Sequence, residues 1–259
     1  MHASLWISQT GLTAQDARLN SISNNLANVG TTGYKRDRAV FQDLLYQIKR
    51  QPGAQSSQDT TLPSGLQQGT GVRTVATQKV FTLGNLQVTE QPLDMAVNGR
   101  GFFQVLTPSG NLAYTRDGQF QVDSTGQLVT SSGYVVQPAI TIPTTASTVT
   151  IGADGIVTTV VDGTSSQAGQ IQLADFANPA GLQAQGDNLF GETSASGAPS
   201  TSNPGINGIG SVLQGTLENS NVNVVEELVN MISTQRAYEM NSKVISTVDQ
   251  MLSFITQNI

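Results

Sequence analysis

The side chains that most often perform catalysis are scarce in this sequence. His2 is the only histidine, it stands near the N-terminus, and there is no cysteine. A Ser-His-Asp triad, a histidine-rich metal site and a thiolate site are therefore not expected. Eighteen acidic residues remain, so residue counts leave open a carboxylate pair that hydrolyses a glycosidic bond. Acids that stand beside glycine, such as Asp117 and Asp154, are interpreted as turn residues, and we expect no active site.

Glycine-rich segments that resemble nucleotide or metal loops each lack a required residue. Gly99 and Gly101 precede an apolar run, but the third glycine of a dinucleotide-binding loop would fall on Gln104. Asp154 and Asp162 each precede a glycine without the later ligands of a calcium-binding loop. No cofactor and no metal ion are predicted.

The charges argue against nucleic acid and membrane as partners. The formal net charge is -6, and no lysine or arginine lies between Arg116 and Arg236, a stretch that carries several acids. Such a surface repels phosphate groups. The early basic residues, Lys35, Arg36 and Arg38 among them, are interpreted as a solvated loop. No apolar segment is long enough to span a bilayer, and the first residues lack the pattern of a cleaved secretory signal.

The N-terminal segment carries a heptad pattern. Leucines recur every seven residues and other residues occupy the intermediate steps, as in Leu5, Leu12, Leu19 and Leu26 with Ser8, Gln15, Ile22 and Val29. This 3-4 spacing is the seam of a coiled coil and predicts a helix over about 4–29. Asn28, Gly30 and Gly33 tolerate left-handed backbone angles and should end that helix.

The C-terminal segment repeats the pattern. Apolar residues recur every seven positions and two more widen the stripe: Val224, Met231, Tyr238, Ile245 and Leu252, with Leu228 and Val248. Ser220 or Asn221 is expected to cap this helix, and two acids, Glu226 and Glu227, fall in its first turns, where the helix dipole favours them. The predicted helix is about 35 residues long, so it needs a partner helix to cover its stripe.

Between the helices the pattern changes to short alternating segments broken by turn dipeptides. Asn, Asp, Ser or Thr precedes glycine at 98–99, 109–110, 117–118, 125–126, 132–133, 154–155 and 162–163. Such pairs readily supply the positive φ angles of tight hairpins. An antiparallel β region is therefore expected, with an irregular stretch at 191–210.

The sequence thus predicts an α+β fold. Long N- and C-terminal helices pair as a coiled-coil layer, and a mainly antiparallel β domain is inserted between them. The expected parts are an N-terminal helix (1–33), an extended arm or linker (34–74), the β domain (75–215) and a C-terminal helix (216–259). Because several seam positions are polar, the burial between two such helices hardly offsets the conformational entropy that they lose on folding. This favours a subunit whose ends fold when it assembles with like copies.

Three motifs resemble those of flagellar rod and hook proteins, in the same order along the chain. The first covers 23–28 and 32–35, with the motif positions Asn24, Asn25, Asn28, Gly33 and Tyr34. The second covers 93–103, and the third covers 220–232 and 235–239. The likeness extends over essentially the whole chain.

The length of the chain and one of its segments indicate which members of the family it resembles most. Proximal rod subunits of the family are shorter and lack the β domain, whereas hook proteins are usually longer and carry a further outer domain. Residues 46–57 and 62–66 are similar to a segment typical of one rod member. The resemblance implies a helical tube around an export channel that crosses the periplasm and joins the proximal rod proteins to the hook protein, inside the P- and L-ring proteins. It also implies export through the flagellar type III apparatus without a cleaved leader.

The leading hypothesis is a mechanical subunit of a homo-polymer. Its assembly stripes are expected at Leu5, Leu12, Leu19, Ile22, Leu26, Val224, Leu228, Met231, Tyr238, Ile245, Val248 and Leu252. An arm between subunits is expected at Tyr46, Gln51, Pro52, Gly53 and Pro63. Two alternatives stay open: the hook protein or another rod paralogue, and an extracellular β-domain glycan binder or hydrolase with helical flanks.

Overall fold

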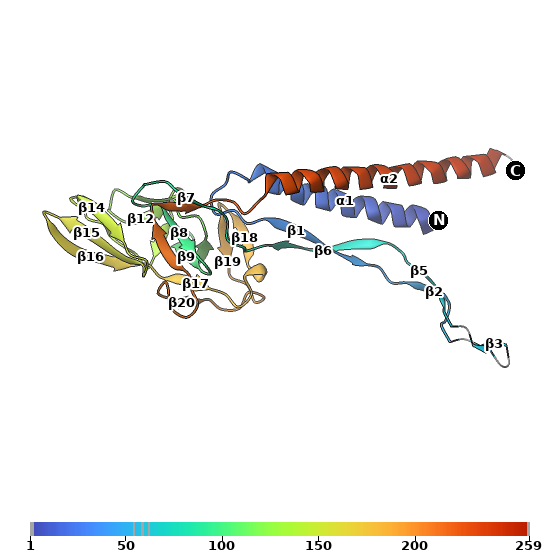
Figure 1. The fold of residues 1–259 in the computed structure, drawn as a ribbon, viewed down its shortest axis with the longest axis horizontal. Helices are drawn as coiled ribbons and strands as arrows, with labels where there is room; N and C mark the ends of the chain where they lie inside the picture. Colours follow the sequence, from blue (N-terminus) through green and yellow to red (C-terminus); the bar gives the residue numbers. More distant parts are fainter. Residues whose placement is uncertain (1–2, 54, 58–59, 62, 258–259) are drawn as a thin grey trace. The chain divides into compact units, whose positions relative to one another are not determined.

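The computed structural model describes residues 3–53, 55–57, 60–61 and 63–257 (Figure 1). His2 lies outside the described residues. The chain divides into two compact units. Unit 1 comprises Met1–Leu26, Asp37–Gln78 and Asn223–Ile259, and unit 2 comprises Ala27–Arg36 and Lys79–Val222. The α+β class is confirmed, with a helix toward each end and a mainly antiparallel β unit between them.

Two long helices belong to unit 1. Helix α1 spans Ala3–Ala27 and α2 spans Val224–Gln257, close to the predicted ranges. The capping residue of α2 was predicted wrongly. Asn223 Oδ1 accepts hydrogen bonds from the backbone N–H groups of Val225 (3.0 Å) and Glu226 (3.4 Å), so Asn223 supplies the cap.

The two helices of unit 1 lie side by side (Figure 1). Near the end of α1, the side-chain amide of Asn25 donates to the Glu227 carboxylate over 3.4 Å. Farther along, a Cβ added to Gly11 would lie 3.0 Å from Asn241 Nδ2. The helix backbones therefore approach closely where the sequence places a glycine.

The segment expected to be an extended arm forms a β ribbon, also within unit 1. Strand β1 (Asp37–Asp43) pairs with β6 (Val72–Lys79), and β2 (Gln47–Arg50) pairs antiparallel with β5 (Leu66–Gln68). Beyond them β3 (Gln55–Ser57) pairs antiparallel with β4 (Thr60–Thr61). Pairing satisfies backbone hydrogen bonds that an isolated extended chain would leave to water, so a segment without a core of its own still becomes regular.

Unit 2 is built on a nine-stranded sheet in the described residues. Its strand order is β11-β12-β13-β9-β10-β19-β18, and β17 pairs with both β9 and β20. The bounds are β9 Phe102–Leu106, β10 Leu112–Thr115, β11 Phe120–Val122, β12 Leu128–Thr130, β13 Val135–Gln137, β17 Leu173–Asp175, β18 Gln183–Gly186, β19 Leu189–Gly191 and β20 Ser200–Ser202. Strand β20 lies inside the stretch 191–210, which was predicted to be irregular throughout.

Smaller sheets complete unit 2. Strands β14 (Thr148–Ile151), β15 (Ile156–Val161) and β16 (Thr164–Gln170) form an antiparallel meander. Strand β7 (Leu86–Val88) pairs with β22 (Thr216–Glu218), and β8 (Met95–Asn98) pairs with β21 (Ser211–Gln214). A short 3-10 helix, η1, covers Pro179–Gly181.

Most of the glycines in the predicted turn dipeptides have positive φ angles, as at Gly110, Gly126 and Gly155. Gly118 is the exception. Its φ is not positive, and a Cβ there would collide with the backbone carbonyl of Met95, so the close approach of the β8 backbone explains this glycine.

The core of unit 2 lies on both faces of β9, because successive side chains of a strand point in opposite directions. Phe103 packs in a large aliphatic cluster with Val105, Leu128 and Ile171. Its neighbour Phe102 packs in an aromatic cluster that includes Tyr114, Phe176 and Phe190. Each such buried side chain contributes about 1.5–3 kcal/mol relative to exposure.

Candidate assembly surfaces

The predicted stripe of α1 is partly covered within the chain. Ile22 is buried, while Leu5, Leu12, Leu19 and Leu26 are half-buried. Two small residues of the same helix, Ser8 and Ala14, are buried more fully than these leucines. Four leucines of α1 thus keep apolar surface that another molecule can cover.

The predicted stripe of α2 divides into two groups. Met231, Ile245, Val248 and Leu252 are half-buried, whereas Val224, Leu228 and Tyr238 are exposed by 39, 43 and 47%. Buried positions on α2 include two polar residues, Glu227 and Thr234. The Thr234 hydroxyl donates to the carbonyl of Asn230 over 2.7 Å, which satisfies it within the helix.

A second apolar face of α2 was missed by the sequence analysis. Its members are 45–70% exposed and follow helical steps of three, four, seven and eight: Val225, Val229, Ile232, Met240, Val244, Met251 and Phe254. We call these seven residues the outer stripe. The spacing of 225, 229 and 232 could have revealed it, but one heptad frame had already been assigned to this helix.

The predicted arm residues lie on the ribbon, and all five are exposed: Tyr46, Gln51, Pro52, Gly53 and Pro63. Apolar neighbours are exposed as well, with Leu45 at 90% and Ile48 at 56%. Gly53 has a φ of +80° and forms part of a turn. The ribbon therefore carries apolar side chains that unit 1 itself does not cover.

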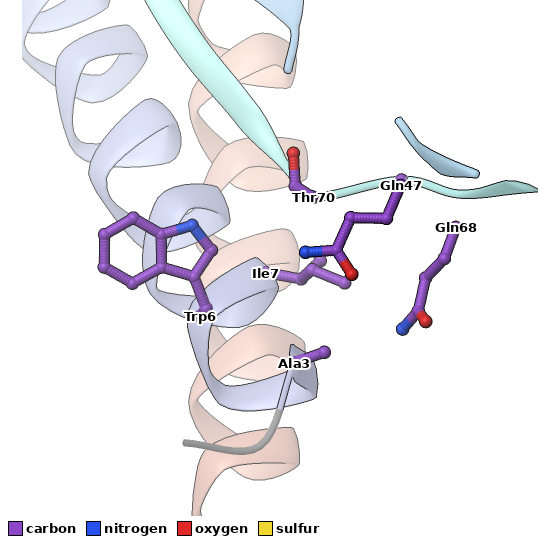
Figure 2. A pocket seen from close by; sticks show the side chains of 7 residues that line it. Ala3, Trp6, Ile7, Gln47, Gln68 and Thr70 are labelled. Atoms are coloured by element: carbon purple, nitrogen blue, oxygen red, sulfur yellow. The ribbon is translucent and has the colours of Figure 1, made fainter. Parts of the chain in front are cut away.

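A cavity of about 330 Å³ lies within unit 1 between α1 and the ribbon (Figure 2). Ile7 contributes to one wall and the amides of Gln47 and Gln68 to another, while the Trp6 ring points away from these amides. Trp6 is 49% exposed. The lining side chains include no acid or base, so the cavity offers no group for acid-base catalysis.

Asn25 of the family motif joins the end of α1 to the start of β1. Its Oδ1 accepts from the backbone N–H of Asp37 and its Nδ2 donates to the carbonyl of Asp37, both over 2.8 Å. This amide pairs with the backbone as a neighbouring strand would, and Asn25 is 1% exposed. The sequence predicted Asn25 only as a position of the family motif and did not identify Asp37 as its partner.

The other motif residues lie in the last turns of α1 and in the segment that follows it. Gly33 has a φ of +70°, and a Cβ there would lie 2.6 Å from the backbone nitrogen of Asp117. The Lys79 ammonium lies 5.1 Å from the centroid of the Tyr34 ring. Asn28 accepts hydrogen bonds from Thr31 through its backbone carbonyl and its side chain, each over 3.2 Å, whereas Asn24 is exposed.

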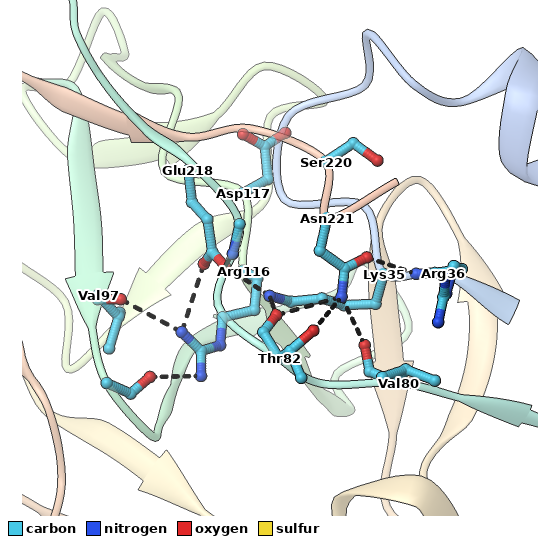
Figure 3. Close-up of polar contacts among 12 residues, drawn as sticks. Lys35, Arg36, Val80, Thr82, Val97, Arg116, Asp117, Glu218, Ser220 and Asn221 are labelled. Carbon is cyan, nitrogen blue, oxygen red and sulfur yellow. Dashed lines mark hydrogen bonds and ion pairs between the residues drawn. The ribbon is translucent and has the colours of Figure 1, made fainter. Parts of the chain in front are cut away.

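Three charged side chains are buried together in unit 2 (Figure 3). Glu218 forms ion pairs with Lys35 and, over 3.3 Å, with Arg116. Burial lowers the pKa of Lys35 and that of Arg116, and in each case the Glu218 carboxylate opposes the shift. The interpretation of Lys35 as part of a solvated loop is wrong, because Lys35 is only 1% exposed.

A lysine with a lowered pKa can act as a nucleophile, but this one has no access to a substrate. Its ammonium also donates to the carbonyl of Thr82 over 2.8 Å, and its side chain is fully enclosed. The described side chains include no group of three or more His, Cys, Asp or Glu residues placed to hold a metal ion. Within the described part of the chain, neither helix combines the length and apolarity needed to cross a bilayer.

Three parts of the chain match flagellar protein families. Residues 5–35 match the flagella basal body rod protein family. Residues 96–159 match the D1 domain of the flagellar hook proteins FlgE/F/G, and residues 213–258 match the C-terminal region of the flagellar basal body rod FlgEFG proteins.

Relatives match over nearly the full length. The flagellar basal-body rod protein FlgG of Buchnera aphidicola subsp. Schizaphis graminum is 58% identical over 99% of this chain and 100% of the relative. FlgG of Caulobacter vibrioides is 49% identical over 96% of each chain, and FlgG of Bacillus subtilis is 38% identical over 97% of each. The chain therefore belongs to the FlgG family of flagellar basal-body rod proteins and is a structural subunit of the distal rod, not an enzyme.

Proposed function

We propose that this rod subunit self-assembles through its terminal helices into a helical tube that surrounds an export channel and transmits torque across the periplasm. The observation that carries the proposal is the outer stripe. Its seven apolar side chains lie on one face of α2, and each is at least 45% exposed. Exposed apolar side chains gathered on one helix face are typical of a surface that another protein covers.

The partner of the outer stripe is another copy of the same chain. Fully burying an exposed aliphatic or aromatic side chain contributes about 1.5–3 kcal/mol, and a half-exposed one contributes roughly half of that. Seven such residues offer several kcal/mol per copy, which favours a polymer. The half-buried leucines of α1 offer further apolar surface. Within each copy, α1 and α2 pair as a coiled-coil layer.

Membership of the rod family supports the further partners. The proximal rod proteins adjoin one end of the tube and the hook protein adjoins the other, and the P- and L-ring proteins surround it. The subunit reaches its place through the flagellar type III apparatus without a cleaved leader.

The ribbon bridges adjacent subunits. Tyr46 and its apolar neighbour Ile48 are more than half exposed, so contact with a second copy would bury surface that unit 1 leaves in water. The turn at Pro52 and Gly53 can reach a neighbour without a core of its own, because strand pairing already satisfies the ribbon backbone.

Val229→Asp tests the helix-driven assembly. Val229 is 60% exposed, so the charge is tolerated in the monomer but would be buried in a polymer. We expect the association constant to fall by about tenfold or more, since 1.4 kcal/mol corresponds to a factor of ten. Sedimentation and electron microscopy measure polymer formation, and circular dichroism measures folding.

Ser246→Asp is the matched control, because Ser246 is exposed on the same helix and lies outside the outer stripe. It should polymerise as the parent chain does. Normal filaments from Val229→Asp would contradict the proposal.

A further inference from the structure

We propose that Lys35, Arg116, Glu218 and Asn221 form a connector tie, which holds together the strands through which the chain leaves unit 2 and so stiffens the subunit against torque. This inference rests on the proposed function as a torque-bearing subunit. It assigns a mechanical role to four residues of unit 2 that come from three distant parts of the sequence.

The chain passes between the units four times. The passages lie between Leu26 and Ala27, Arg36 and Asp37, Gln78 and Lys79, and Val222 and Asn223. Any force that one unit exerts through the backbone on the other crosses these four peptide segments. On the unit 2 side, Lys35 and Asn221 each lie within two residues of a passage.

Asn221 joins three of these connecting segments through one amide (Figure 3). Its Oδ1 accepts from the backbone N–H of Arg36 over 2.8 Å. Its Nδ2 donates to the carbonyl of Val80 over 2.8 Å and to the hydroxyl of Thr82 over 3.0 Å. Only a side chain with both a donor and an acceptor can make this set of bonds.

Glu218 also bonds to two of these segments and anchors the set. Its backbone carbonyl accepts from the N–H of Gly33 over 2.7 Å, which holds the segment that follows α1. Its carboxylate accepts from the Lys35 ammonium, from the N–H of Gly84 over 2.9 Å and from Arg116. The connecting segments are thereby bonded to one buried anion.

Arg116 extends the tie to the strands of unit 2. Its guanidinium donates to the carbonyl of Val97 in β8 over 3.3 Å and to that of Gly99 over 2.7 Å (Figure 3). Arg116 itself directly follows β10. Displacement of a connecting segment would therefore pull on two separate strands.

Stability alone is a weak reason for such a cluster. Buried ion pairs lose much of their attraction to desolvation, and well-packed apolar side chains often replace them without loss of stability. Apolar contacts are not directional, whereas charge-assisted hydrogen bonds fix both distance and angle. The arrangement therefore fits a requirement for fixed strand geometry.

Asn221→Ala tests the tie in the full-length chain. The amides of Arg36 and Gly84 report on the Asn221 and Glu218 bonds respectively, and hydrogen exchange of the soluble monomer measures their protection. We expect exchange at Arg36 to accelerate by about tenfold or more, the effect of losing a hydrogen bond, while Val105 in the core stays protected. Filaments of the variant should show a larger variance of subunit twist by cryo-electron microscopy.

Asn111→Ala is the matched control, because Asn111 is exposed in a turn of unit 2. The paired variant Lys35→Met with Glu218→Gln removes two of the three buried charges and preserves volume, and it should accelerate exchange at Gly84. Unchanged protection at Arg36 in Asn221→Ala, or unchanged twist variance in its filaments, would overturn the inference. Loss of polymerisation by the parent chain would instead overturn the proposed function, and the monomer measurement remains decisive for the tie.

Discussion

At the scale of single residues, polar side chains and glycines fix the positions of the backbone segments around them. Asn25 and Asn221 use both ends of a side-chain amide to hold backbone segments in unit 1 and unit 2 respectively. Lys35 and Glu218 are buried because each satisfies the other and the surrounding backbone. A charged side chain can be buried when ion pairs and hydrogen bonds replace its contacts with water.

Gly33→Ala should destabilise unit 2 by roughly 2–4 kcal/mol, because positive φ strain adds to a collision with the backbone of Asp117. Gly110→Ala is a matched control: its φ of +81° is similar, but a Cβ there would meet nothing within 4 Å. It should cost about 1–2 kcal/mol, the strain alone. Chemical denaturation of both variants measures the difference, and equal losses would refute the close-packing argument.

Asp117 should give unfolding stability a specific pH dependence. Burial raises its pKa above the ordinary value of 3.8, although the N–H of Gln119 opposes the shift by donating to the carboxylate. The folded state therefore keeps this proton over a pH range in which the unfolded chain has lost it. The stabilisation is fully present below pH 3.8 and is lost as the pH rises through the folded pKa.

Asp117→Asn removes this titration. Relative to the parent chain, the variant should gain unfolding free energy as the pH rises from below 3.8 toward neutrality, as measured by urea denaturation across that range. A difference between the two proteins that does not change with pH would show that Asp117 has an ordinary pKa.

Only some of these residues could be predicted from the sequence. Gly33 and Asn25 could be located by the family motif, but their partners, Asp117 and Asp37, could not. Lys35 was misassigned because its partner Glu218 is 183 positions away, and no local pattern records such a distance. Burial of a charge depends on the tertiary partner, which composition does not reveal.

At the scale of elements, the spacing of apolar residues and the turn dipeptides predicted the helices and most of the hairpins. Both helices were located from heptad spacing, and most of the hairpins were located from glycine dipeptides. The ribbon was seen only as an extended segment, because its strands alternate weakly and bury little. The outer stripe was missed because α2 carries apolar residues on two faces, which a single helical period cannot separate.

Deleting residues 46–66 should leave assembly possible and yield a polymer that bends more easily. The deletion removes exposed ribbon surface and no residue of either helix. The persistence length of filaments in electron micrographs measures the effect and should fall. Replacing 54–57 with a Gly-Ser segment of the same length is a control for the change in sequence alone. A stiffness equal to that of the parent polymer would count against a bridging role of the ribbon.

At the scale of the whole molecule, the sequence indicated the fold class and the protein family. It did not indicate which segments belong to which compact unit. The α+β class and the rod family were recognised from the arrangement of helices and motifs along the chain. The stretch Ala27–Arg36 belongs to unit 2 although it directly follows α1. Its hydrogen bonds to Glu218 and Val80 account for this, and such long-range bonds leave no periodic signal.

The order of the segments has a consequence for biosynthesis. A nascent chain emerges with α1 first and α2 last, so the early helix must wait for its companion until translation is nearly finished. A prematurely terminated product ending before residue 223 would still contain every segment of unit 2 but could not complete unit 1. Unit 1 can therefore be completed only after the last helix has been synthesised.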